Sequence, residues 1–443
     1  MSVNRHNLLF QALLGAVLWL VSAPLYATPK IEHWTLENGA RVYFVEARDL
    51  PMVMLNVVFD AGSARDPKTL NGLAMLTNGL LNEGTGELDA DAIASTFEGL
   101  GVEFGASNDR DMAGASLKSL TDRKLLDPAL NLFARLLAAP SFPLPSLERE
   151  RQRALLGLKH AKASAGDVAA RAFFSKLYAG HSYALSSDGN EAGLEKIARD
   201  DLIAFHARHY VGRNAVLALI GDISLQDAKS IATRVVGKLP AGEAAAPLPK
   251  VADLPRRRAE YVIAHPSSQT HLMVGEIGVS RNDPDYYPLY LGNFILGGSG
   301  LISRLAQEVR EKRGLSYSVS SYFMPLRESG PFLLSLQTKN SQRREALTVV
   351  RRVLKEFTDK GPTAEELVAA KKNVTGGFPL RIDSNRKIVD YLTVIGFYGL
   401  PLTYIDDFIP RIEAVTAEQI RDAFRRRVHP EQMLTVIVGG TGS

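Results

Sequence analysis

The sequence repeats itself at an offset of about 217 residues, and this repeat limits the folds that the chain can adopt. Residues 63–67 (SARDP) correspond to residues 280–284 (SRNDP), and residues 210–221 correspond to residues 428–439. In the second pair, a helical pattern leads into an apolar run that ends in glycine. A repeat this long indicates a duplicated domain, because solenoid units recur every 20 to 50 residues or so.

Each half of the chain combines short strand patterns with longer helical patterns. In the first half we expect strands at residues 41–45, 52–59, 102–107 and 113–117, and helices at 70–81, 89–100, 126–137, 146–162 and 168–178. In the second half we expect strands at 270–277, 317–323 and 332–338, and helices at 286–296 and 303–312. Runs of strands followed by runs of helices favour an α+β fold over a doubly wound sheet. The expected architecture is two homologous α/β-layered domains, each with a sheet rich in antiparallel pairs.

The two halves are separated by a stretch of different composition. Residues 239–255 contain four prolines and three consecutive alanines, which is typical of a semi-extended linker. We therefore predict an N-terminal domain over residues 28–238, a linker over 239–257 and a C-terminal domain over 258–443.

The N-terminus has the pattern of a secretory signal peptide. Arg5 and His6 precede an apolar run over residues 8–23, and Ala27 offers a small residue for cleavage. We predict a signal peptide over residues 1–27 and a periplasmic mature protein without a membrane segment. The alternative is an uncleaved anchor, although the apolar run is short for a full membrane span.

The overall composition excludes several classes of function. An apolar content of 46% with 23% charged residues is that of a globular protein with a core. The formal net charge of +4 is too small to indicate a nucleic-acid partner. The chain has no cysteine, which excludes thiol catalysis and disulfides.

Residues 72–85 (GLAMLTNGLLNEGT) carry the frame of a known motif without its chemistry. They resemble the zinc helix of the pitrilysin/insulinase-type metallopeptidases, in which G-x-A-H-x-x-E-H precedes apolar residues and G-T. Met75 and Gly79 stand at the positions of the two histidine ligands, and Asn78 stands at that of the general-base glutamate. Zinc prefers imidazole, thiolate or carboxylate ligands, and an amide has no basic form that could take a proton from water.

A second segment carries the position of the third zinc ligand of that family. The family places this glutamate at the end of an E-R-E-x-x-x-x-L-x-E pattern, which residues 148–157 (ERERQRALLG) follow. Gly157 falls at the ligand position, so all four positions of the metal site are replaced. The resemblance therefore implies that this chain holds no metal or other cofactor, and that zinc belongs to a partner subunit.

His206 and His209 are the histidines whose spacing raises the question of another metal site. They are three residues apart on a predicted helix, with Asp200 and Asp201 one to two turns earlier. Histidines near a helix C-terminus are also favoured by the helix dipole alone, and this structural interpretation is the one we prefer.

Residues 303–319 (SRLAQEVREKRGLSYSV) retain a different signature. They resemble the S-R-L-x-x-x-V-R-E-x-R-G-L-x-Y-x-V segment of the same family, in which an arginine and a tyrosine reach the substrate from the domain opposite the zinc. The pair maps onto Arg310, in the last turn of a helix, and Tyr317, at the expected start of a strand. A guanidinium can bind peptide carbonyls, and a phenol can donate to a developing oxyanion. The alternative is a surface ion pair with Glu308 or Glu311 and a half-buried strand tyrosine.

The resemblance implies a clamshell in which two such subunits enclose a chamber for unfolded peptides. The first hypothesis is an inactive partner subunit of a periplasmic zinc endopeptidase heterodimer, which closes the chamber and supplies Arg310 and Tyr317. Such a chain is not active alone, and hydrolysis is expected only in complex with a zinc-bearing homologue. The alternative is a non-catalytic structural or peptide-binding homodimer. For a third possibility, an enzyme with an independent site, the sequence offers no residues.

Overall fold

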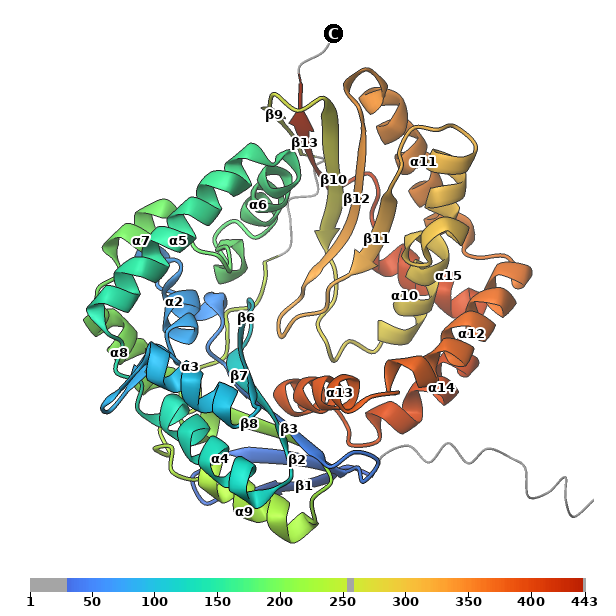
Figure 1. Cartoon of the computed structure of the whole chain (residues 1–443). Coiled ribbons are helices and arrows are strands. Elements are labelled where there is room, and N and C mark those ends of the chain that lie inside the picture. The colour runs from blue at the N-terminus through green and yellow to red at the C-terminus, as the bar shows by residue number, and fades with distance from the viewer. Residues whose placement is uncertain (1–29, 253–258, 441–443) are drawn as a thin grey trace, which may run out of the picture. The chain divides into compact units, whose positions relative to one another are not determined.

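The computed structural model describes residues 30–252 and 259–440, and Figure 1 shows the arrangement of their helices and strands. The predicted signal peptide, residues 1–27, lies outside the described residues. Each half of the chain contributes one large sheet, and the first half also contains a two-stranded sheet of β4 (Gly84–Thr85) and β5 (Leu88–Asp89). The first large sheet contains β1 (Glu32–Thr35), β2 (Arg41–Glu46), β3 (Met52–Phe59), β6 (Glu103–Asn108), β7 (Ala113–Leu120) and β8 (Ala215–Gly221). The second contains β9 (Glu260–Ala264), β10 (Gln269–Ile277), β11 (Val319–Phe323), β12 (Pro331–Lys339) and β13 (Leu434–Gly439).

The two sheets have the same topology. The strand order β2-β8-β3-β7-β6 of the first recurs as β9-β13-β10-β12-β11 in the second, and β1 extends the first sheet beyond β2. The pairs β2–β8 and β9–β13 are parallel, and all other pairs in these two sheets are antiparallel. The sequence repeat thus corresponds to a structural repeat, and the predicted α+β fold of two similar layered halves is confirmed.

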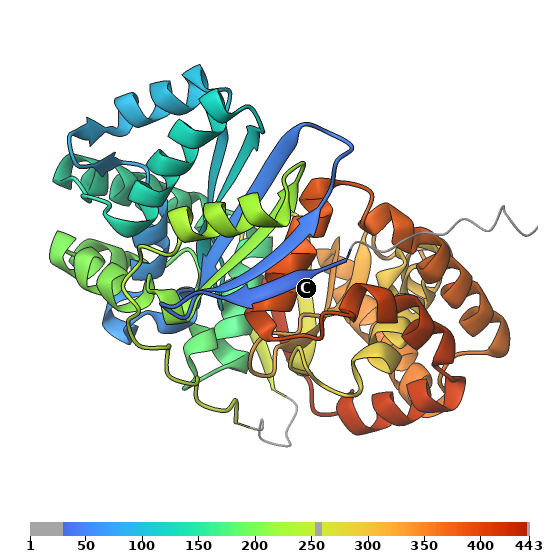
Figure 2. The same cartoon turned by 90° about the horizontal axis from the view of Figure 1, so that it is seen from below.

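Helices cover both sheets. The first half contains α2 (Leu73–Gly79), α3 (Ala90–Gly99), α4 (Arg123–Ala138), α5 (Leu144–Ala163), α6 (Ala165–Leu177), α7 (Glu191–Lys196), α8 (Arg199–His209) and α9 (Leu225–Val235). The second contains α10 (Tyr286–Asn293), α11 (Arg343–Lys360), α12 (Ala364–Gly377), α13 (Asn385–Tyr398), α14 (Tyr404–Ala414) and α15 (Ala417–Arg427). Figure 2 shows the same helices and strands from below.

Strand β3 illustrates how one sheet serves two cores. Its residues alternate between the two faces, as the period of a strand requires. Leu55 and Val57 pack into a core with α4 and α9, whereas Met54 and Val58 pack into a core that includes α13.

Helix α13, from the second half, lies on the sheet of the first half. The Arg41 guanidinium donates to the Gly396 carbonyl at 2.9 Å, and the Asn56 amide donates to the Thr393 hydroxyl at 3.2 Å. Glycine is needed at position 396, because an added Cβ would lie 2.6 Å from atoms of Tyr43 and Val216.

Helix α6 makes the reciprocal contact with the sheet of the second half. Its residues Ala169 and Phe173 pack with Leu434 and Val436 of β13. A Cβ added at Gly275 in β10 would lie 2.8 Å from the Phe173 ring, so this close approach also depends on glycine. One helix of each half therefore packs on the sheet of the other half.

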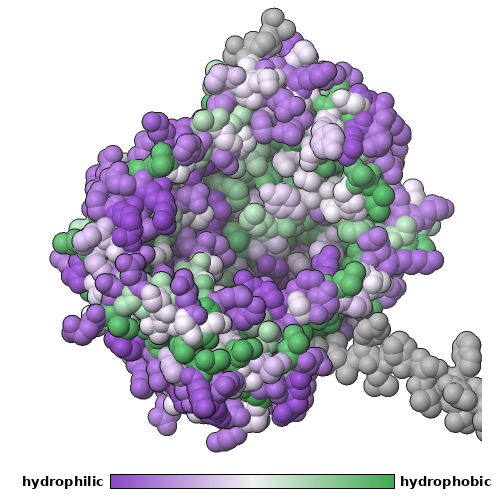
Figure 3. All heavy atoms as spheres, viewed as in Figure 1, coloured by the Kyte–Doolittle hydropathy of each residue, from purple (hydrophilic) through white to green (hydrophobic). Residues whose placement is uncertain are grey.

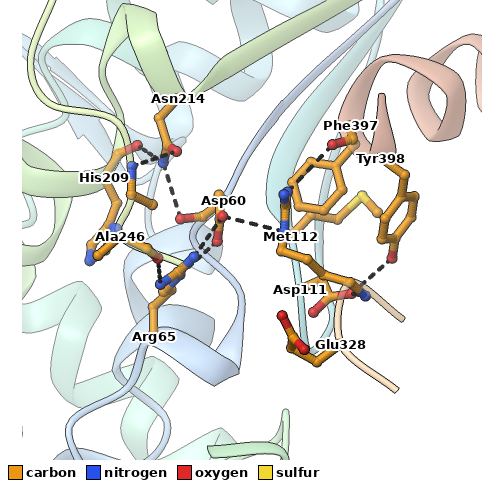
Figure 4. Close-up of polar contacts among 12 residues, drawn as sticks. Asp60, Arg65, Asp111, Met112, His209, Asn214, Ala246, Glu328, Phe397 and Tyr398 are labelled. Atoms are coloured by element: carbon orange, nitrogen blue, oxygen red, sulfur yellow. Dashed lines mark hydrogen bonds and ion pairs between the residues drawn. The ribbon is translucent and has the colours of Figure 1, made fainter. Parts of the chain in front are cut away.

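A buried carboxylate joins the two halves (Figure 4). Asp111, in the turn between β6 and β7, accepts hydrogen bonds from the Tyr398 hydroxyl at 2.9 Å and the Arg327 backbone N–H at 2.8 Å. Its other oxygen accepts from the Tyr183 hydroxyl at 2.6 Å. Arg327 also lies 3.5 Å from the Asp60 carboxylate. The described residues from Ile31 onward accordingly form one compact unit.

Four expected elements differ from the structure. The helix predicted at residues 286–296 ends as α10 at Asn293 and continues as a π-helix over Phe294–Gly298. The helix predicted at residues 70–81 is confined to α2, because Gly72 has a φ of 113° and the chain enters the helix only after it. The helix predicted at 303–312 becomes a π-helix over Ala306–Glu311. The strand predicted from Tyr317 begins at Val319 instead, because Ser316 donates to the carbonyls of Ser318 and Gln337 and bends the chain there. Within the described ranges, no helix is long and apolar enough to cross a membrane.

Candidate functional site

Helix α2, which carries three of the replaced zinc positions, is held at its N-terminus by Asp66. The Asp66 carboxylate accepts from the backbone N–H of Gly72 at 2.7 Å and of Ala74 at 2.8 Å, and from the Asn71 amide at 3.0 Å. Burial raises the pKa of Asp66 to about 6, although these three hydrogen bonds act in the opposite direction. The start of α2 is thus held by a buried carboxylate whose ionisation costs free energy.

Two of the replaced zinc positions, distant in sequence, meet in one pocket. Met75 of α2 and Gly157 of α5 both line a pocket of about 840 Å³ that also borders α6 and residues 184–190. A Cβ added at Gly79 or Gly157 would meet no atom within 4 Å outside its own helix turn. The fold therefore retains the space for ligand side chains at these positions, but the side chains that would bind metal are missing.

Asn78, at the position of the general base, has a structural role. It is only 2% exposed, and both ends of its amide are used. The amide nitrogen donates to the Ser107 carbonyl at 2.9 Å, and the amide oxygen accepts from the buried Tyr210 hydroxyl at 3.0 Å. Asn78 thereby ties α2 to β6 and to the end of α8, and it offers no free atom to a substrate.

These residues do not fit a zinc ion. A thioether, an amide with both ends engaged and two residues without side chains provide none of the ligands that zinc prefers. In the part of the chain that the structure describes, no cluster of three or more His, Asp or Glu side chains is arranged to hold a metal.

His206 and His209, the other candidates for metal binding, are core residues. His206 hydrogen-bonds to the Leu137 carbonyl at 2.9 Å and stacks on Tyr210 with 4.7 Å between ring centroids. Burial lowers the pKa of both histidines to about 4. The Asp201 carboxylate instead accepts a hydrogen bond from the backbone N–H of Ala198 at the start of α8. The arrangement matches the structural interpretation.

Arg310 and Tyr317 lie together in the second half. The Arg310 guanidinium carbon is 4.6 Å from the centroid of the Tyr317 ring, a distance typical of a cation–π contact. Tyr317 is 78% exposed, so its hydroxyl is open to solvent rather than half-buried in a strand. Arg310 also lies 3.4 Å from the Glu311 carboxylate. It belongs to the π-helix, an irregularity that often occurs at functional sites.

Sequence reasoning did not single out Arg110, which lines the same pocket as Met75 and Gly157. It lies in the turn between β6 and β7, next to Asp111, and its guanidinium carbon is 3.7 Å from the centroid of the Phe174 ring. The only signal in the sequence is the DRD triplet at residues 109–111, which is indistinguishable from a solvated turn.

Known sequences and structures agree with this geometry. The sequence profile described as Insulinase (Peptidase family M16) matches residues 41–189, and the one described as Peptidase M16 inactive domain matches residues 196–374. A crystal structure of a peptidase M16 inactive domain from Pseudomonas fluorescens is 42% identical, with a TM-score of 0.90, and the match covers 93% of this chain and 98% of that one. The chain therefore belongs to peptidase family M16, the insulinase family, as its motifs indicated.

More distant relatives also match most of this chain. A protein named non-peptidase homolog YmxG from Helicobacter pylori is 26% identical over 90% of this chain and 91% of its own length. An uncharacterized zinc protease YmxG from Bacillus subtilis is 24% identical over 93% of this chain and 99% of its own length. The structure of a Helicobacter pylori protease, at 19% identity and a TM-score of 0.83, shares the fold. The replaced zinc positions of this chain, together with these relatives, fit a non-catalytic subunit of the family.

Proposed function

We propose that this chain is the non-catalytic subunit of a periplasmic zinc endopeptidase heterodimer. It pairs with a zinc-bearing homologue, encloses unfolded peptide with it, and supplies Arg310 and Tyr317 to the peptide bound at the partner's zinc. The export of the chain rests on the signal pattern of residues 1–27.

The observation that carries this proposal is the contrast between the exposed pair and its surroundings. Tyr317 is 78% exposed and rests on Arg310, so its hydroxyl adds nothing to the core. A chain that served only as a scaffold would have no use for a polar aromatic side chain displayed in this way. The hollow on the face drawn in Figure 3, lined by hydrophilic and hydrophobic residues, offers room for a peptide.

The chemistry assigned to the pair follows from its groups. The Tyr317 hydroxyl can donate a hydrogen bond to the oxygen on which negative charge develops when water attacks a peptide carbonyl. The Arg310 guanidinium presents several donors in a fixed fork, and it can hold carbonyls of the peptide backbone while its face rests on the tyrosine. Water activation would remain with the zinc-bearing subunit, because Asn78 has no basic atom.

Sizing chromatography of this chain mixed with a zinc-bearing homologue tests the pairing. We expect a new species near twice the mass of one subunit, whereas each protein alone elutes at lower mass. Independent elution at all concentrations would reject the heterodimer. A dimer formed by this chain alone would instead favour the structural or peptide-binding homodimer.

A further inference from the structure

The pocket that contains the replaced zinc positions has an arginine in its wall. The Arg110 guanidinium lies over the Phe174 ring at 3.7 Å, and both residues line the pocket of about 840 Å³ with Met75 and Gly157. A guanidinium that stacks on an aromatic face keeps its N–H groups in the plane of the group, directed outward at its edges. Arg110 is therefore held in one orientation without using its terminal donors.

The terminal nitrogens of Arg110 have no hydrogen-bond partner among the described residues. Its Nε donates to the Tyr183 carbonyl at 3.3 Å. The neighbouring carboxylates are already engaged: Asp109 accepts from the backbone N–H of Asp111 and Met112, and Asp111 accepts from two tyrosine hydroxyls and a backbone N–H. Burial lowers the pKa of Arg110, although its neighbours Tyr178, Asp109, Asp188 and Asp111 act in the opposite direction.

The other charged residues of the pocket are matched. Arg171 donates to the Asp188 carboxylate at 2.8 Å, to the Ser186 hydroxyl at 3.0 Å and to the Gly189 carbonyl at 3.2 Å, which fixes the loop over residues 186–189. Asp167, in the first turn of α6, interacts electrostatically with His271. Arg110 is thus the charged residue of this pocket whose donors are free for a ligand.

We propose that this pocket binds a carboxylate of a peptide, with Arg110 as its two-pronged donor. A carboxylate accepts two parallel N–H bonds from one guanidinium, and such bonds are among the strongest in proteins. The pocket is far larger than a free small anion, and Leu158, Phe174 and Leu185 give it apolar walls for the attached chain. The inference rests on the proposed function only in that the ligand is a peptide. The carboxylate belongs to either the peptide C-terminus or an acidic side chain.

Binding of three labelled peptides to the mature chain tests this site and identifies the source of the carboxylate. The first is an unstructured peptide of about ten residues without Asp or Glu and with a free C-terminus, the second is its C-terminal amide, and the third is the amide with one internal glutamate. By fluorescence anisotropy, we expect at least one carboxylate peptide to bind about tenfold more tightly than the plain amide. Arg110→Gln should abolish that difference, and Arg110→Lys should retain part of it.

Arg153→Gln is the matched control. Arg153 lies on α5 next to Ala154, which lines the pocket, but the Arg153 side chain is 74% exposed and pairs with Glu150. It should bind all three peptides like the parent, and thermal unfolding should show that both variants fold. Equal binding of the three peptides by the parent, or an equal effect of Arg110→Gln and Arg153→Gln, would overturn the site. If Arg110→Gln still forms the heterodimer while the parent shows no preference for a carboxylate, only this inference fails and the proposed function stands.

Discussion

Two regions of this chain carry motifs of the same peptidase family, and they have changed in opposite ways. On α2, Asn78 is buried and both ends of its amide bond to neighbouring elements. After the π-helix over Ala306–Glu311, Tyr317 is 78% exposed and lies against the Arg310 guanidinium. The first region has the spacing of the zinc-helix motif but lacks its zinc-binding and basic side chains. The second region has functional groups, those of Arg310 and Tyr317, that contribute little to the packing of the fold. Residues retained without a structural role are the better guide to what the chain does.

Removing the Tyr317 hydroxyl should have the largest effect. In the complex with a zinc-bearing homologue, Tyr317→Phe should lower kcat by about a hundredfold or more, because one donor to the developing oxyanion is lost. Assembly and zinc content should not change, since the substitution removes one exposed oxygen. Steady-state kinetics on the purified complex measure this effect.

Two further variants sharpen that result. Arg310→Ala should also raise KM, because it deletes donors that hold the peptide before the reaction. Tyr261→Phe removes a hydroxyl from another partly exposed tyrosine, 39% exposed on the edge strand β9, and should behave like the parent. Kinetic parameters of Tyr317→Phe within twofold of the parent would remove its catalytic role.

Asp66, which caps α2, should make the stability of the chain depend on pH. Its pKa is about 6 in the folded chain and near 3.8 when unfolded, so the folded state binds the proton more tightly. The contribution of Asp66 to the free energy of unfolding is therefore greatest below pH 3.8. It falls by about 3 kcal/mol as the pH rises through 6. The difference in the free energy of unfolding between Asp66→Asn and the parent should therefore shift in favour of the variant as the pH rises from 4 to 7.

Denaturant unfolding of both proteins across this pH range provides the measurement. His206 and His209, whose pKa values are lowered to about 4, act in the opposite direction, since stability from them is lost as the pH falls below 6.5. Both histidines are present in parent and variant, so their effects cancel in the difference. A difference that does not vary with pH would contradict the account of Asp66.

Asn78→Ala should destabilise the isolated chain by about 2 kcal/mol. The substitution leaves the buried Tyr210 hydroxyl without its partner and removes the bond to the Ser107 carbonyl. Gly79→Ala, one position later on an exposed site with open space, should be neutral or stabilising by up to about 1 kcal/mol. Equal stability of Asn78→Ala and the parent would show that Asn78 is not the structural link described above.

Restoring the two histidines should have the smallest effect. The double variant Met75→His, Gly79→His still lacks the third ligand at Gly157 and a base at Asn78, so it should not hydrolyse peptide. Metal analysis and a peptidase assay of the purified variant check this expectation. Chelator-sensitive hydrolysis by the double variant would show that the replaced positions are not what makes the chain inactive.

Much of this structure was predictable from the sequence, because the repeat and both motifs have fixed spacing. The repeat indicated two matching α/β-layered halves, and the motif frame brought Met75 and Gly157 into one pocket. The sequence could not show that Tyr317 lies before a strand, because the bend depends on bonds from Ser316 to a distant strand. It could not single out Arg110, whose setting depends on Phe174 in another element. The exchange of α6 and α13 between the halves was equally hidden, since helix patterns do not specify which sheet a helix covers.

Hydrolysis of an unfolded peptide by this chain, by a zinc-bearing homologue and by their mixture is the most direct test of the central claim. The account predicts no hydrolysis and no stoichiometric zinc for this chain alone, and chelator-sensitive hydrolysis that appears on mixing and requires Tyr317. One tightly bound zinc per chain with hydrolysis by this chain alone would contradict the claim that it is a non-catalytic subunit. Activity of the homologue that this chain does not change would contradict the claim that the two work together.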